Sequence, residues 1–115
     1  MGARLGSVLI GTALALAPAV AAAHAYPTPV IADYVFGCMA ANGQTQEALR
    51  RCSCSIDVIS SILPLERYEE AETILRMRQV RGGGEKMSLF RETPEAREAV
   101  DALKRAQVEA EVRCF

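Results

Sequence analysis

The chain has 115 residues, and its 13 Lys and Arg nearly balance its 14 Asp and Glu, for a formal net charge of −1. No block of Lys or Arg stands out, which argues against nucleic acid as the partner. The length is that of one domain. A domain so small has a core of marginal stability, which disulfide bonds commonly supplement.

Residues 1–25 have the features of a cleavable export signal. Arg4 supplies a positive charge, an apolar run covers 5–17, and Pro18 stops the run before a stretch of small residues. This run is too short for a transmembrane helix, which needs roughly 20 residues. We therefore expect a signal peptide over 1–25, and after its removal a periplasmic or secreted single domain over 26–115 with no membrane anchor.

Two cleavage sites fit the small-residue stretch, one after Ala25 and one after Ala23. The choice decides the fate of His24, the single histidine of the chain. Cleavage after Ala25 leaves a mature chain without histidine, whereas cleavage after Ala23 places His24 at the new N-terminus.

The apolar pattern of the mature chain is helical from its first helix onward. The two prolines within 26–29 predict an extended lead-in. Helices are then expected over 30–42 and 45–63, where apolar residues recur at intervals of three and four. Gly43 stands where a helix C-terminal glycine belongs, and Thr45 is the expected N-cap of the second helix.

The second half of the mature chain predicts two further helices. One covers 65–81, with acids early and bases late, as the helix dipole favours. A glycine triplet then opens a loop over 82–93. Thr93 followed by Pro94 is a strong start signal for a last helix over 94–113. The fold class that follows is an all-α, four-helix domain.

The four cysteines all follow the predicted signal, and their even number in an oxidising compartment predicts two disulfides. Cys52 and Cys54 are two positions apart, so on a helix they point about 200° from each other and cannot pair together. Two connectivities remain. The short turn between the first two helices brings Cys38 opposite Cys52 and favours the pairs Cys38–Cys52 and Cys54–Cys114 over the alternative.

Residues 76–91 are the predicted partner-binding region. Five bases against one acid give this segment a local charge of +4, and three apolar side chains lie among them. The bases could instead belong to a dipole-matched helix end on a solvated face. Separately, the three apolar side chains could fold back onto the core. The candidate binding residues are Arg76, Arg78, Arg81, Lys86, Met87, Leu89, Phe90 and Arg91.

Other chemistries find little support in the residues. A four-thiolate metal site or a Cys52–Cys54 redox pair is conceivable, but both more often use a two-residue spacer, and exported thiols are normally oxidised. The stretch G-G-G-E-K-M-S at 82–88 lacks the spacing of a phosphate-binding loop. Adjacent carboxylates such as Glu69 and Glu70 do not converge on a site. We expect no enzyme activity, no cofactor and no metal.

Three sequence stretches carry a resemblance to known proteins: C-M-A-A-N-G at 38–43, C-S-C-S-I-D at 52–57 and A-E-T-I-L-R-M-R at 71–78. The pattern of one cysteine, 13 intervening residues and Cys-x-Cys resembles that of small exported bacterial helical proteins, most of them uncharacterised. The longer pattern is similar to accessory proteins of periplasmic quinoprotein alcohol oxidation. This resemblance implies a scaffold stabilised by disulfides, and it identifies no catalytic residue in this chain.

The expected function is that of a non-enzymatic periplasmic binding or accessory protein whose partner is an unidentified exported protein. The resemblance implies an exported oxidoreductase in that place. One alternative is a thiol-based metal carrier or redox protein, in which cysteines are free during function. A further alternative is a periplasmic acid-stress chaperone.

Overall fold

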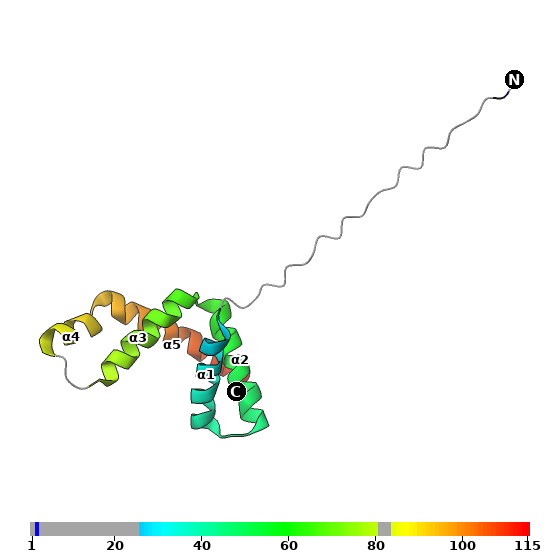
Figure 1. Cartoon of the computed structure of the whole chain (residues 1–115), viewed down its shortest axis with the longest axis horizontal. Helices are drawn as coiled ribbons and strands as arrows, with labels where there is room; N and C mark the ends of the chain where they lie inside the picture. Colours follow the sequence, from blue (N-terminus) through cyan, green and yellow to red (C-terminus); the bar gives the residue numbers. More distant parts are fainter. Residues whose placement is uncertain (1, 3–25, 81–83) are drawn as a thin grey trace.

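The structure of the chain is a computed structural model that describes residue 2 and residues 26–80 and 84–115. Its described part contains five α-helices and no strand, so the predicted all-α class is confirmed (Figure 1). The rest of the predicted signal peptide lies outside the described residues. The helices are α1 (Thr28–Asn42), α2 (Gln46–Ile62), α3 (Leu65–Gln79), α4 (Gly84–Arg91) and α5 (Pro94–Cys114).

Helix α1 begins two residues earlier than the sequence predicts. Pro27 is its N-cap, and Pro29 lies within the first turn, where the missing amide hydrogen costs no intrahelical hydrogen bond. The expectation of an extended lead-in over 26–29 was therefore wrong for Thr28 and Pro29, which are helical. At the other end, Gly43 has a φ of 105°, a backbone conformation that residues with a Cβ rarely adopt. Its amide donates a hydrogen bond to the carbonyl of Met39.

The starts of α2 and α5 follow the predicted capping residues. The hydroxyl of Thr45 accepts a hydrogen bond from the amide of Ala48 at 3.0 Å. The hydroxyl of Thr93 does the same for the amide of Ala96 at 3.1 Å, with Pro94 as the first helical residue. Each cap satisfies an amide that has no partner within its own helix.

Helix α4 is absent from the sequence prediction, which placed a loop over 82–93. Gly84, at a φ of 70°, begins the helix, and Glu85 in its first turn and Arg91 in its last turn match the helix dipole. Eight residues are too few to hold a helix by propensity, so its stability comes from contacts with the end of α3, described below. Arg81, which the sequence assigned to the third helix, lies outside the described residues.

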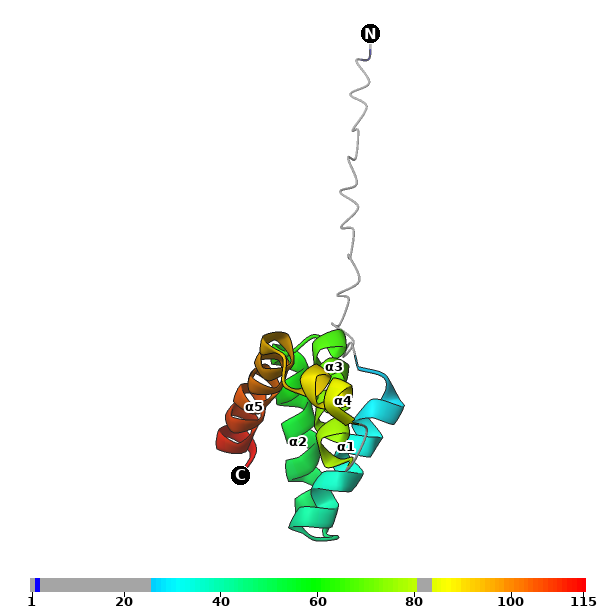
Figure 2. The same ribbon diagram turned by 90° about the vertical axis from the view of Figure 1, so that its left-hand side faces the viewer.

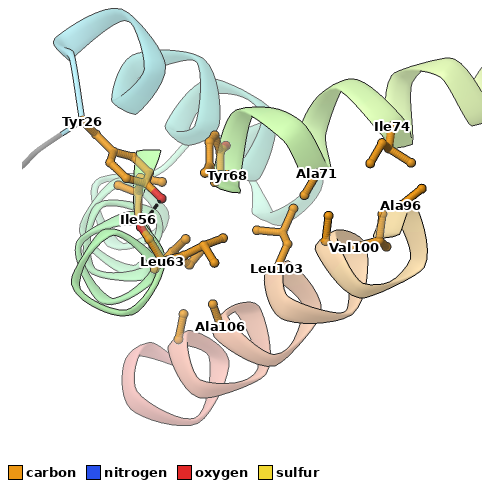
Figure 3. Packing of buried hydrophobic residues seen from close by; sticks show 13 residues of the cluster. Tyr26, Ile56, Leu63, Tyr68, Ala71, Ile74, Ala96, Val100, Leu103 and Ala106 are labelled. Atoms are coloured by element: carbon orange, nitrogen blue, oxygen red, sulfur yellow. Dashed lines mark hydrogen bonds between the residues drawn. The ribbon is translucent and has the colours of Figure 1, made fainter. Parts of the chain in front are cut away.

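The core lies where α5 crosses α2 and α3 (Figure 3). The face that α5 presents there consists mostly of small residues, which lets its neighbours approach closely. Figure 3 shows Val100 and Leu103 pointing from α5 toward Ala71 and Ile74 of α3. The buried residues of α5 are Ala96, Ala99, Val100, Leu103, Ala106 and Ala110.

Tyr26 closes the core just before the start of α1. Its ring lies 5.1 Å from that of Tyr68, and its hydroxyl donates a 2.7 Å hydrogen bond to the carbonyl of Leu63. Burial, together with nearby carboxylates of α3, raises the pKa of Tyr26 to about 12. The residue directly after the predicted cleavage position Ala25 is thus already part of the packed domain.

Both predicted disulfides are present. Cys38–Cys52 joins α1 to α2, and Cys54–Cys114 joins α2 to the last turn of α5, each with 5.8 Å between Cα atoms. Cys52 and Cys54 leave α2 on different sides, and Figure 2 shows α2 lying between α1 and α5. The predicted connectivity is therefore confirmed.

No helix in the described part of the chain combines the length and apolar character that crossing a bilayer requires.

Removing the Cys54–Cys114 bridge should strongly destabilise the domain. The bridge joins residues 60 positions apart. By loop-closure entropy, the variant Cys54→Ala/Cys114→Ala should lose about 4 kcal/mol of unfolding free energy. Urea denaturation measures this change. Val112→Ser, a substitution at an exposed position in the same last turns of α5, is the control and should leave the urea midpoint nearly unchanged. Equal midpoints for the parent and the Cys54→Ala/Cys114→Ala variant would contradict the prediction.

Candidate functional site

The described members of the predicted partner-binding region lie on the C-terminal part of α3 and on α4 (Figure 1). Helix α4 projects beyond the main helix packing and contacts the rest of the domain mainly through α3. Arg81 and the side chains of Lys86 and Phe90 lie outside the described part of the structure. The side chains that remain comprise two arginines directed inward, the exposed Arg76 and exposed apolar groups.

Arg91 is an internal link. One of its terminal nitrogens, Nη1, donates to the carbonyls of Met77 and Val80, at 2.9 Å in each case. Its Nε donates to the carbonyl of Met87 at 3.2 Å. The guanidinium thus adds a second hydrogen bond to the carbonyl of Met77, which also accepts from the amide of Val80, and one to the carbonyl of Val80. It ties α4 to the C-terminal end of α3.

Arg78 is also directed inward. Its side chain is 26 % exposed, its Nε lies 3.5 Å from a carboxylate oxygen of Glu92, and its Nη2 donates to the carbonyl of Arg91 at 3.4 Å. The Nε is buried and makes no hydrogen bond of good geometry. Arg78 therefore pairs with Glu92, and both Arg78 and Arg91 donate hydrogen bonds to backbone carbonyls of their own chain. These two predicted binding residues have intramolecular partners.

Arg76 points outward and contacts another helix. Its guanidinium lies 3.4 Å from the carboxylate of Asp33 on α1, and both side chains are about 70 % exposed, at 70 % and 72 %. An ion pair this exposed contributes little to stability. Arg76 consequently stays available to a partner.

The apolar residues of this region are exposed. Val80 is 59 % exposed, Met87 41 % and Leu89 66 %. The alternative in which Met87 and Leu89 fold back onto the core is therefore wrong. We call Val80, Met87 and Leu89 the α4 patch.

Two grooves flank α3, and neither was identified from the sequence. The groove between α1 and α3 has a volume of about 480 Å³, and the one between α3 and α5 about 460 Å³. Glu69 and Thr73 lie on the ridge that the two grooves share. Helical spacing placed the acids of α3 on its surface, but only the positions of α1 and α5 show that this surface forms the walls of two grooves.

The α1–α3 groove holds a carboxyl group in an unfavourable setting. Burial raises the pKa of Glu72, Arg76 opposes this effect and Asp33 adds to it. Glu72 is therefore the acid in this groove whose charge the fold disfavours.

The cysteines offer no reactive thiol in this structure, since all four are joined in the two disulfides. Within the described ranges, no group of three or more His, Cys, Asp or Glu side chains is arranged to hold a metal ion. His24 lies outside these ranges.

Loss of the Arg91 link should loosen the α4 end without unfolding the domain. Hydrogen bonds from a charged donor contribute about 1.5–3 kcal/mol, so Arg91→Met should speed amide exchange in α4 and in the last turn of α3 roughly tenfold or more. Hydrogen–deuterium exchange by mass spectrometry measures this. Arg97→Met, which removes an exposed arginine of α5, is the control; unchanged exchange in α4 for Arg91→Met would show that the link is dispensable.

Substitution of Glu72 should stabilise the protein at neutral pH. Since its pKa is raised on folding, the carboxyl favours the folded state below its unfolded pKa, and this contribution is lost as the pH rises through the folded pKa. Glu72→Gln keeps a neutral group throughout. Its melting temperature should therefore exceed that of the parent at pH 7 and converge with it below about pH 4. A gain that is the same at both pH values would contradict this, and Glu98→Gln is the exposed control.

Comparisons with known proteins leave the family open. No protein-family model matches the chain, no curated protein is significantly similar to it, and no solved structure matches its fold at a significant level.

Proposed function

We propose that the protein is a non-enzymatic binding or accessory protein of the periplasm, which docks on an exported protein through the α4 patch and the neighbouring Arg76. The observation that carries the proposal is the exposure of Met87 and Leu89 on α4, a helix held outside the core, and of Val80 at the end of α3. The resemblance of the cysteine and α3 stretches to accessory proteins suggests an exported oxidoreductase as this partner.

The physical character of the α4 patch supports docking. Methionine is enriched at protein interfaces because its flexible, polarisable side chain adapts to a partner surface. An adjacent exposed arginine adds charge that directs orientation and association rate. A short helix held mainly by Arg91 can also adjust its position on binding at little cost.

Export is supported by two features of the chain. Residues 1–25 have the pattern of a signal peptide, and the domain that follows begins with the buried Tyr26. Two disulfides are typical of proteins that fold in an oxidising compartment.

Capture from the periplasm with matched variants tests the proposal. The tagged full-length chain, expressed in its native host, should be recovered from the periplasmic fraction together with a stoichiometric protein partner. The variant Met87→Ser/Leu89→Ser should lose that partner, because it removes apolar side chains from the docking surface. Val108→Ser/Val112→Ser, which removes two exposed apolar side chains from α5, should keep the partner.

The same preparation separates the proposal from a thiol-based function. Titration of the purified protein under denaturing conditions should find no free thiol, and metal analysis should find no stoichiometric zinc or copper. Two or more free thiols, or a bound metal, would favour the thiol-based carrier. A partner retained by Met87→Ser/Leu89→Ser would remove the α4 patch from the binding surface.

A further inference from the structure

The groove between α3 and α5 combines an apolar floor with an acidic rim. Ile74 and Ala96 are buried beneath it, at 5 % and 4 % exposure, and the half-buried Met77 also lines it. Its volume of about 460 Å³ falls within the range of about 300–1,000 Å³ of protein ligand sites. The lining residues are Glu69, Glu70, Thr73, Ile74, Met77, Thr93, Glu95 and Ala96.

The rim carries unneutralised negative charge. Three of the lining residues are glutamates, and none is basic. Glu70 is paired with Arg67 at 2.9 Å, whereas Glu69 and Glu95 have no ion-pair partner among the described residues. The groove therefore presents two carboxylates to whatever occupies its floor.

The neighbouring α1–α3 groove extends this negative field. It shares Glu69 and adds Asp33 and Glu72, with Arg76 as its single base. Acidic side chains thus line both sides of α3, while Arg76 and Arg78 lie in the last turn of that helix. An anionic ligand would be repelled here, and a cationic one attracted.

We propose that the α3–α5 groove binds a cationic amphipathic segment of a partner protein. An aliphatic side chain of that segment lies against Ile74, Met77 and Ala96, and its Lys or Arg side chains pair with Glu69 and Glu95. The charge complementarity selects this occupant over an acidic segment or an anionic lipid surface. The inference rests on the proposed function, because the segment belongs to the protein partner, but it assigns a second contact surface separate from the α4 patch.

Binding of a synthetic probe tests the inference directly. The probe is a short amidated peptide of Leu and Lys at amphipathic helical spacing, titrated into the disulfide-bonded protein by isothermal calorimetry at low salt. Glu69→Gln/Glu95→Gln should weaken its binding about fivefold, since two exposed ion pairs are lost. Asp101→Asn/Glu111→Gln makes the same change in net charge away from the groove and should leave the affinity unchanged.

Two control peptides separate the floor from the rim. Replacing Leu by Ser in the probe should abolish saturable binding, and replacing Lys by Glu should do the same. Equal affinity for the Ser peptide, equal losses in the two double variants, or no saturable binding of the Leu-Lys peptide would each overturn the inference.

The remaining outcomes concern the occupant. The variant Met87→Ser/Leu89→Ser should bind the peptide as the parent does. Loss of peptide binding in this variant would overturn the assignment of the peptide to the α3–α5 groove. A failure of docking through the α4 patch is thus distinguishable from a failure of peptide binding in the groove. Sedimentation of the protein alone should give a monomer at all concentrations tested. A dimer that Glu69→Gln/Glu95→Gln abolishes would show that a second copy fills the groove, and would overturn the proposal.

Discussion

Two disulfides leave α2 in different directions, and the arrangement of the other helices depends on this constraint. Cys52 holds α1 through Cys38, while Cys54 holds the last turn of α5 through Cys114. Because the two positions on α2 are about 200° apart, its neighbours must lie on opposite sides. Helix α1 has no fully buried residue and depends on its bridge and on half-buried contacts, whereas α5 is also fixed by its small-residue face.

Helix α3 turns this scaffold into a surface that can bind. It packs on α5 through Ala71 and Ile74, which leaves its acidic flank as the wall of two grooves. Its C-terminal end carries α4 through the guanidinium of Arg91. Both the α4 patch and the α3–α5 groove are therefore positioned by α3, but their charges differ. The α4 patch is apolar with the base Arg76 nearby, whereas the groove has an apolar floor below acidic side chains.

Local signals in the sequence predicted most of the fold. The caps at Thr45 and Thr93 and the disulfide pairing follow from rules that act within a helix or across one short turn. The sequence did not predict α4, because an eight-residue helix after a glycine triplet has no strong periodic signal and depends on Arg91 reaching carbonyls of another helix. The inward orientation of Arg78 and the two grooves depend equally on tertiary placement, which residue spacing alone does not specify.

The two disulfide bonds restrain only part of the molecule. All four bridging cysteines lie in α1, α2 and the end of α5, and no disulfide reaches α3 or α4. Opening of the end formed by α3 and α4 therefore breaks hydrogen bonds, the Arg78–Glu92 ion pair and side-chain packing but no disulfide, while α1, α2 and α5 remain covalently joined. The proposed docking surface therefore lies on the part of the molecule that is free of covalent cross-links, so an adjustment of α4 to a partner strains neither disulfide.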